Sequence, residues 1–332
     1  MAGLPLGCPV FLYAHLHKVE LACTLSDATA TGDAVHKAII SDKGVSTMSD
    51  RKKITLPLLF DKMSKRFPLT MITCYDYPMA YLVEQAGIDI VLVGDSLGMT
   101  VLGYDSTLPV TMDDMIRHAQ AVRRGTTNSW LIGDMPYMTY QPSDELAVVN
   151  AGRFMAEAAC DGVKLEGGQE MATRVRAIVA AGIPVMGHLG LTPQSVSSLG
   201  GFRLQGKSAK QAKKIVDDAQ ALEEAGAMAI LLELVPDQVC GLITERAGIP
   251  IISLGSGPNA NGQLLIFHDM FGLYPKFTPK MAKKYGDAGK VIGDGLKEYV
   301  AEVTGRVFPE PERYFGIKEE EYTELLRLLD AK

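Results

Sequence analysis

The sequence predicts a single-domain α/β protein with the (βα)8 fold, the TIM barrel. From residue 69 onward, short β-branched or aliphatic runs alternate with longer helical patterns, as repeated βα units require. Eight such runs can be counted, and a chain of 332 residues has room for the about 250 residues of a barrel. Because a doubly wound sheet usually has fewer strands, the barrel is the favoured fold.

The eight predicted strands are short and are separated by helical or turn-forming stretches. They are Thr70–Cys74, Ile90–Val93, Trp130–Ile132, Gly162–Leu165, Pro184–Gly187, Ala229–Leu232, Ile251–Leu254 and Gln263–Phe267. Many of the helical stretches between them end on a glycine, which suits the left-handed conformation that closes a helix. These glycines are Gly87, Gly125, Gly162, Gly182, Gly226 and Gly248.

Two connections after strands are unusually long and rich in glycine, Ser96–Thr111 and Leu191–Ser208. Barrels bind their substrates with such loops, so we expect both at the active site.

Residues 48–316 are assigned to the catalytic barrel. In the remaining segment, 317–332, acidic residues precede four leucines, which predicts a C-terminal helix packed on the barrel or on a neighbouring subunit.

The first 47 residues differ from the rest because they show no sustained hydrophobic period. They lack the early positive charge of a secretory signal and the arginines of a mitochondrial presequence. Met48 is followed by the polar stretch Ser-Asp-Arg-Lys-Lys, so Met48 is a candidate for the residue at which translation begins. The role of residues 1–47 is left open.

Charge, cysteine content and hydropathy exclude several classes of protein. The net charge of −6, without any basic stripe, argues against a nucleic-acid partner. Five cysteines without a Cys-x-x-Cys pair argue against a disulfide framework and a zinc cluster, and they fit a reduced cytoplasmic or organellar compartment. No apolar run approaches the about 18 residues of a membrane-spanning helix, so we expect no membrane segment.

Charged side chains follow five of the predicted strands at the point where each strand ends. These residues are Asp95, Asp134, Glu166, His188 and Glu233. In a barrel they converge at the C-terminal mouth, where such enzymes carry out their chemistry. Each also has a structural interpretation, because an aspartate after a glycine often caps a helix and Glu233 alone could form an ion pair.

A metal ion would allow these carboxylates to lie together, since without a cation they would raise one another's pKa and destabilise the fold. Carboxylate oxygens without cysteine or several histidines suit a hard ion, so Mg²⁺ is the expected metal. Lys164 and Glu166 face the same side of one strand, either as a structural pair or with Lys164 directed at an anionic substrate. His188 is a metal ligand, a hydrogen-bond donor to substrate or a buried structural histidine, and we favour the substrate pocket.

Long motifs surround these residues. They are VGDSLGM at 93–99, GYDSTLPVT at 103–111, VKLEGG at 163–168, GHLGLTPQS at 187–195 and GQLLIFHDMFG at 262–272. In these motifs, and from about Ile54 to Gly316, the sequence resembles the ketopantoate hydroxymethyltransferase family. The resemblance implies a (βα)8 enzyme that transfers a hydroxymethyl group from 5,10-methylenetetrahydrofolate to 3-methyl-2-oxobutanoate, giving 2-dehydropantoate for pantothenate and coenzyme A biosynthesis.

The resemblance also implies a role for each site residue. Those implied to surround Mg²⁺ are Asp95, Asp134 and, through water, Glu166. Those implied to contact the 2-oxo acid are Asp95, Ser96, Asp134 and Lys164. Glu233 is implied to be the catalytic base, removing the C3 proton to give a Mg²⁺-stabilised enolate. The family further implies a cytoplasmic homo-oligomer, commonly a decamer.

Three positions depart from the family's pattern, because Ser253 and Ser256 replace a usual Gly and Ala and Asn261 stands where Asp is frequent. These departures put local loop shape and folate affinity in question.

One alternative function is that of another Mg²⁺-enolate barrel of the isocitrate lyase or phosphoenolpyruvate mutase type, but this chain lacks their Lys-Lys-Cys-Gly-His stretch. The other is a non-catalytic 2-oxo-acid-binding oligomer, and the presence of both Lys164 and Glu233 argues against it.

Overall fold

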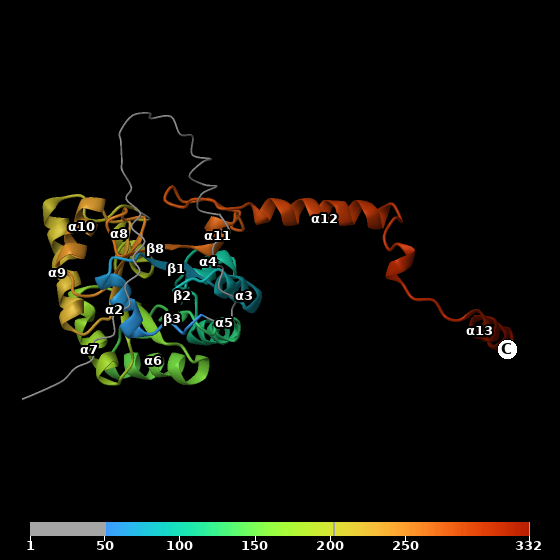
Figure 1. Ribbon diagram of the computed structural model, residues 1–332, viewed down its shortest axis with the longest axis horizontal. Coiled ribbons are helices and arrows are strands. Elements are labelled where there is room, and N and C mark those ends of the chain that lie inside the picture. Colours follow the sequence, from blue (N-terminus) through green and yellow to red (C-terminus); the bar gives the residue numbers. More distant parts are fainter. Residues whose placement is uncertain (1–50, 202, 332) are drawn as a thin grey trace, which may run out of the picture. The chain divides into compact units, whose positions relative to one another are not determined.

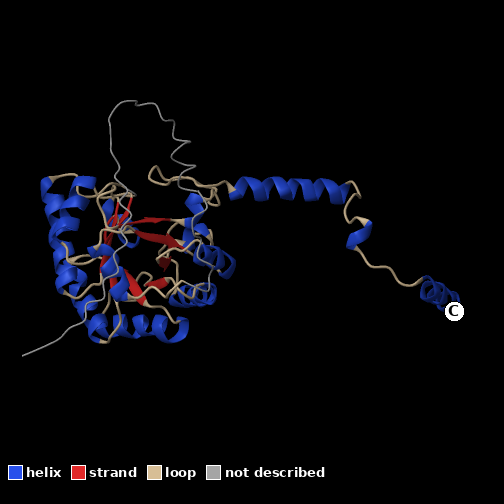
Figure 2. Cartoon of the chain, viewed as in Figure 1, coloured by secondary structure: helices blue, strands red, loops and turns tan. Residues whose placement is uncertain are grey.

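The computed structural model of the chain describes residues 51–201 and 203–331, which contain eight parallel strands closed into a barrel (Figures 1 and 2). The strands are β1 (Leu69–Thr73), β2 (Ile90–Val93), β3 (Trp130–Asp134), β4 (Gly162–Glu166), β5 (Val185–Gly190), β6 (Ala229–Glu233), β7 (Ile251–Leu254) and β8 (Gly262–Leu265). Neighbours in the chain pair with one another, and β1 closes the ring against β8, where Met71 lies opposite Leu264. The predicted TIM barrel is confirmed.

Twelve α-helices and three short 3-10 helices connect or follow the strands in the described part of the chain. The α-helices are α2 (Leu56–Ser64), α3 (Tyr77–Gln85), α4 (Leu97–Thr100), α5 (Met112–Gly125), α6 (Asp144–Ala158), α7 (Ala172–Ala180), α8 (Val196–Leu199), α9 (Ala209–Glu224), α10 (Asp237–Arg246), α11 (Phe267–Met270), α12 (Ala288–Thr304) and α13 (Glu319–Asp330). The 3-10 helices are η1 (Gln169–Met171), η2 (Pro193–Ser195) and η3 (Pro311–Arg313).

Several helices begin at side chains that bind their first free N–H groups. Thr111 and Asp114 form a capping box at α5, and Ser208 and Gln211 form another at α9. In each box the two side chains satisfy backbone donors that have no partner within the helix. These caps fix where the helix after each long active-site connection begins.

Strand boundaries differ slightly from the predicted ones. β3, β4 and β6 run on to Asp134, Glu166 and Glu233, so these residues belong to the sheet and not to the turns after it. The last predicted strand is wrong at its end, because pairing stops at Leu265 and Phe267 starts α11. There the backbone N–H of Phe267 donates to Thr73 Oγ1 at 3.1 Å instead of to a neighbouring strand.

The predicted turn glycines fall into two groups. Gly87, Gly182 and Gly226 adopt left-handed φ values of 78°, 84° and 98°, as predicted. The prediction is wrong for Gly125, Gly162 and Gly248, which lack a positive φ. Close packing explains two of them: a Cβ at Gly125 would lie 2.9 Å from the backbone oxygen of Tyr77, and one at Gly162 would lie 2.8 Å from that of Pro184.

Alternate strand residues build two hydrophobic cores. Val163 and Leu165 of β4 pack in the core between sheet and helices, whereas Met186 and Leu231 fill the interior of the barrel. Because successive side chains on a strand point to opposite faces, the polar residues that alternate with the outward set face inward. Lys164 and Glu166 of β4 are such residues.

The remaining sequence predictions have mixed outcomes. The predicted C-terminal helix exists as α13, and none of its residues is buried in the single chain, so its packing partner stays a prediction. Cys74, Cys160 and Cys240 are buried free thiols. Within the described residues, no helix has the length and apolar character needed to cross a membrane. The proposals for residues 1–47 and for a start at Met48 lie outside the described residues.

Candidate active site

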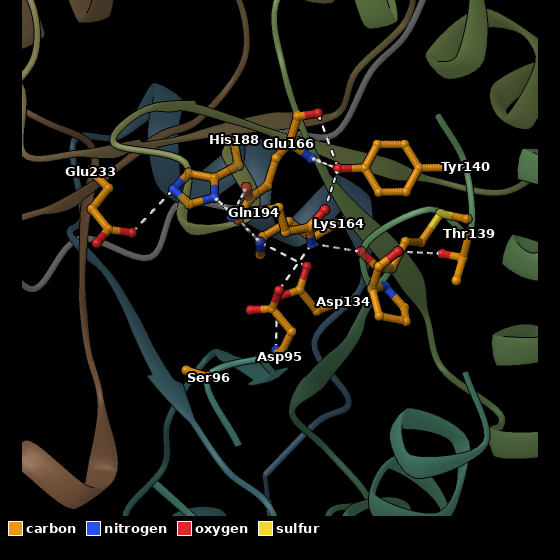
Figure 3. Close-up of polar contacts among 12 residues, drawn as sticks. Asp95, Ser96, Asp134, Thr139, Tyr140, Lys164, Glu166, His188, Gln194 and Glu233 are labelled. Atoms are coloured by element: carbon orange, nitrogen blue, oxygen red, sulfur yellow. Dashed lines mark hydrogen bonds and ion pairs between the residues drawn. The ribbon is translucent and has the colours of Figure 1, made fainter. Parts of the chain in front are cut away.

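A cavity of about 680 Å³ opens at the C-terminal ends of the strands. Among its lining residues are all seven that the sequence analysis selected: Asp95, Ser96, Asp134, Lys164, Glu166, His188 and Glu233. Six of them cluster around Lys164 and His188 in Figure 3, and Ser96 lies beyond Asp95. The strand ends therefore bring together the side chains that the sequence placed up to 138 positions apart.

Lys164 is the positive centre of a buried group of carboxylates. Its Nζ lies 2.7 Å from Asp134 Oδ1 and 3.9 Å from Glu166 Oε1. The backbone N–H of Asp95 donates to the other oxygen of Asp134 at 3.0 Å, which joins the ends of β2 and β3. The lysine and the three carboxylates are almost completely buried, so their charges interact with little screening by solvent.

Burial and mutual repulsion shift the pKa values of these groups. Burial, with repulsion by Glu166, raises the pKa of Asp95, and burial raises that of Asp134 well above its usual range despite the nearby Lys164 ammonium. The pKa of Glu166 is raised to about 7, again by burial. Burial alone would lower the pKa of Lys164, but Asp134, Glu166 and Asp95 together raise it. These four side chains thus bring together three carboxyl groups and one ammonium group, so positive charge from a bound cation would stabilise them.

His188 lies between two carboxylates. Its Nδ1 is 3.3 Å from Lys164 Nζ and 3.2 Å from Glu166 Oε1, and its Nε2 is 3.2 Å from Glu233 Oε2 (Figure 3). Burial and then the Lys164 charge lower the pKa of His188, so the ring is neutral. A neutral ring carries one proton: on Nδ1 it would face Glu166, and on Nε2, with Nδ1 accepting from Lys164, it would face Glu233.

The sequence analysis missed Gln194, the most connected polar residue of the site. Its backbone N–H donates to Glu166 Oε2 at 3.0 Å, and its side-chain amide donates to Asp95 Oδ2 at 2.9 Å. Its Oε1 accepts from Tyr140 at 2.8 Å, and the Tyr140 oxygen in turn accepts from the Glu166 N–H at 3.0 Å. Gln194 lies in the motif at 187–195, which was the available signal, but nothing in the pattern set it apart from its neighbours.

Ser96 belongs to a different part of the cavity wall. Its hydroxyl lies 2.8 Å from that of Tyr75, a buried residue that the sequence analysis did not select. Burial raises the pKa of Tyr75 to about 12, so the phenol remains protonated and can donate to Ser96. The serine hydroxyl is then held with its own proton free to donate into the cavity.

The carboxylates fit a divalent ion that completes its shell with other ligands. Within the described residues, no three His, Cys, Asp or Glu side chains already converge closely enough to hold a metal by themselves. Mg²⁺, however, usually takes one or two protein carboxylates and fills its other positions with water and substrate oxygens. Asp95 and Asp134 suit that mode, and the buried Oδ1 of Asp134 has no hydrogen-bond partner of good geometry in the described part of the chain.

The three departures from the family's pattern have structural uses. Ser256 Oγ donates to the backbone oxygen of Leu232 at 2.8 Å and accepts from the N–H of Val235 at 3.0 Å. Ser253 Oγ accepts from the N–H of Ser256, and Asn261 Oδ1 accepts from that of Ile251. The serines thereby fix the chain on both sides of Glu233.

Comparison with known proteins decides between the expected families. A family model described as ketopantoate hydroxymethyltransferase matches residues 53–311. The chain belongs to the ketopantoate hydroxymethyltransferase family. The 3-methyl-2-oxobutanoate hydroxymethyltransferase of Syntrophomonas wolfei is 50% identical over 268 residues, covering 81% of this chain and 97% of that protein. That of Syntrophobacter fumaroxidans is 49% identical over 282 residues and is covered completely, with 85% of this chain.

Solved structures with the same fold are more distant from this ketopantoate hydroxymethyltransferase family member. Phosphonopyruvate hydrolase in complex with oxalate and Mg²⁺ aligns with a TM-score of 0.52 at 15% identity, covering 83% of this chain and 98% of that one. Oxaloacetate acetylhydrolase in complex with oxalate gives 0.52 at 14% identity, covering 84% and 96%. At this level of identity the likeness supports the barrel fold alone.

Proposed function

We propose that this chain transfers a hydroxymethyl group from 5,10-methylenetetrahydrofolate to 3-methyl-2-oxobutanoate, giving 2-dehydropantoate. The observation that carries the proposal is the arrangement at the cavity. Lys164, Asp95 and Asp134 lie on one side of His188, and Glu233 lies on the other as a carboxylate outside the Lys164 group. Family membership and relatives of that name at about 50% identity support the same activity.

The residues have separable tasks in this reaction. Lys164 and Ser96 bind the carboxylate of the 2-oxo acid and orient it. Asp95 and Asp134 would hold Mg²⁺, with Glu166 as a further ligand through water, and the ion would supply charge stabilisation for the enolate oxygen. Glu233 accepts the C3 proton, and His188, whose Nε2 lies 3.2 Å from Glu233 Oε2, lies directly beside that carboxylate.

We further propose a cytoplasmic homo-oligomer, a decamer as in the family. Two helices support association of copies, because α12 and α13 have no buried residue and α13 exposes Leu325, Leu326, Leu328 and Leu329. Burial of apolar surface is favourable by about 25 cal/mol per Å², so packing of a second copy of the chain against this helix face would stabilise the assembly.

A paired assay tests the activity. In D₂O with Mg²⁺, the enzyme should exchange the C3 hydrogen of 3-methyl-2-oxobutanoate without any folate, as seen by proton NMR. With 5,10-methylenetetrahydrofolate it should form 2-dehydropantoate, and both rates should fall when the metal is chelated. Exchange without product formation would limit the chain to 2-oxo-acid enolisation, and neither reaction would leave the non-catalytic binding protein as the better description.

A further inference from the structure

The cavity has a second wall that C3 proton removal does not use. It is formed by the ends of β7 and β8 and by the chain after α11, and its side chains are mostly apolar. They include Leu254, Leu264, Ile266, Tyr274, Phe277 and Met281. A cavity of about 680 Å³ is of the size that encloses drug-sized ligands, far more than a five-carbon acid fills. The second wall is therefore available to a larger, flat co-substrate.

Asp269 is the carboxylate of this wall. It lines the cavity and is only 6% exposed, yet its oxygens accept no hydrogen bond from residues 51–201 or 203–331. The carboxylates on the opposite side of the cavity, here called the first wall, differ from Asp269 in this respect. Asp95, Asp134 and Glu166 each accept a hydrogen bond from a donor in the protein. Burial raises the pKa of Asp269 to about 6. Since no donor among residues 51–201 and 203–331 meets it, the Asp269 carboxylate is available to a hydrogen-bond donor on a bound ligand.

The neighbours of Asp269 hold it in position. The N–H of Phe267 donates to Thr73 Oγ1, which ties the start of α11 to the end of β1. The ring of His268 lies 5.2 Å from that of Tyr75, the residue that contacts Ser96. These contacts fix the first two residues of α11, and Asp269 follows them directly in the cavity wall, with its backbone N–H donating to Ile266 O at 3.1 Å.

We propose that Asp269 binds the pterin ring of the one-carbon donor by accepting hydrogen bonds from ring N3–H and the 2-amino group. This rests on the proposed function, in which the donor is a reduced folate. The pyrimidine edge of a pterin offers two neighbouring N–H donors, and the two oxygens of one carboxylate match that pair.

The rest of the wall suits the same ligand. Tyr274 and Phe277, whose ring centroids lie 5.6 Å apart, offer aromatic surface to the flat ring, and Phe277 is half exposed. Lys280 also lines the cavity, where its ammonium can meet the carboxylates of the glutamate tail. This arrangement directs the folate methylene toward the first wall, where the C3 carbanion forms.

Substitution Asp269→Asn keeps the shape but replaces one acceptor oxygen with an amide that repels the pterin donors. The KM for 5,10-methylenetetrahydrofolate and the Kd for tetrahydrofolate should both rise by roughly 10- to 100-fold, as for loss of a charge-assisted hydrogen bond. Folate-independent C3 exchange should persist, which also shows that the variant is folded. The matched control is Asp217→Asn, which removes an exposed carboxylate outside the cavity, and it should change neither constant.

A folate analogue that lacks the 2-amino group makes the test specific to the pyrimidine edge of the pterin. By calorimetry, wild type should bind tetrahydrofolate roughly 10-fold or more tightly than an analogue lacking the 2-amino group, whereas Asp269→Asn should bind the two alike. Equal discrimination by both proteins, or a fall in kcat with Kd unchanged, would overturn the assignment. If wild type itself makes no product from the folate donor, the proposed function fails instead, and the two failures are distinct.

Discussion

At the scale of single residues, the four carboxylates Asp95, Asp134, Glu166 and Glu233 are not equivalent. Asp95 and Glu166 accept hydrogen bonds from Gln194, and Asp134 pairs with Lys164. Among the described residues, the side chain of Glu233 meets only the His188 ring, at 3.2 Å. Glu233 is thus the carboxylate of this group that is not engaged by Lys164 or Gln194, which suits it to accept the C3 proton.

Substitution Glu233→Gln should therefore separate proton removal from binding. Gln keeps the shape of the side chain but cannot accept the proton, so C3 exchange and turnover should fall together by about 10²- to 10⁴-fold. Metal and 2-oxo-acid affinity, measured by calorimetry, should change little because neither is assigned to Glu233. If the variant exchanges at the wild-type rate, the base lies elsewhere, and His188 is the next residue to test.

The Asp269 carboxylate should make stability depend on pH. Its folded pKa of about 6 exceeds that of an unfolded Asp, about 3.9, so the folded state holds the proton more tightly. The stability that this provides is complete below about pH 3.9 and is lost as the pH rises through 6. Asp269→Asn should thus be more stable than wild type at pH 8, with the difference vanishing toward pH 4.

Urea unfolding at several pH values without folate provides the measurement for this prediction. Asp217→Asn is again the control, because its carboxylate is exposed on α9. An equal stability of wild type and Asp269→Asn at pH 8 would show that burial of Asp269 costs nothing.

At the scale of elements, the two-residue period of the strands places the chemistry. Asp134, Glu166 and Glu233 could be predicted because each follows an apolar strand directly, and the barrel brings strand ends together. Gln194 and Tyr140 could not, because their contacts depend on how long connections fold back over the mouth. Asp269 was missed because the last strand was predicted two residues too long, which hid the start of α11.

One element junction lies beside the proposed base. Gly190 ends β5 with a φ of 91° opposite Glu233, and a Cβ there would lie 2.2 Å from the Glu233 backbone oxygen. Gly190→Ala should therefore destabilise the protein by about 3 kcal/mol or more and slow C3 exchange by displacing Glu233. Gly182→Ala is the control, since Gly182 has a similar φ of 84° but open space, and it should cost only about 1 kcal/mol.

Thermal unfolding and the exchange assay distinguish these two variants. Equal losses of stability in both would mean that the backbone angle matters and the contact with Glu233 does not. A destabilised Gly190→Ala that exchanged at the wild-type rate would show that β6 tolerates the displacement.

At the scale of the whole molecule, the family match begins after Met48. The match starts at residue 53, and Ile54 N donates to Asn128 O at 2.7 Å while Arg51 donates to Ile88 O at 2.6 Å. A chain that starts at Met48 keeps all of these contacts. We predict that it unfolds at the same temperature and turns over at the same rate as the full chain. A clear fall in either quantity would make residues 1–47 part of the functional fold.

The contacts of Gln194 have a consequence for how quickly the mouth can open. This one residue of the connection 191–208 is hydrogen-bonded to Glu166 of β4 and to Asp95 and Met135, which follow β2 and β3. Lifting it would leave several buried polar groups without partners at once, each costing about 1–3 kcal/mol. The connection should then behave as a slow latch whose release limits exchange of small molecules with solvent. Deuterium uptake by the amides of 191–208 should rise markedly in Gln194→Ala but not in Gln205→Ala, whose side chain donates to Arg203 O. Equal uptake in both would mean that the latch is held elsewhere.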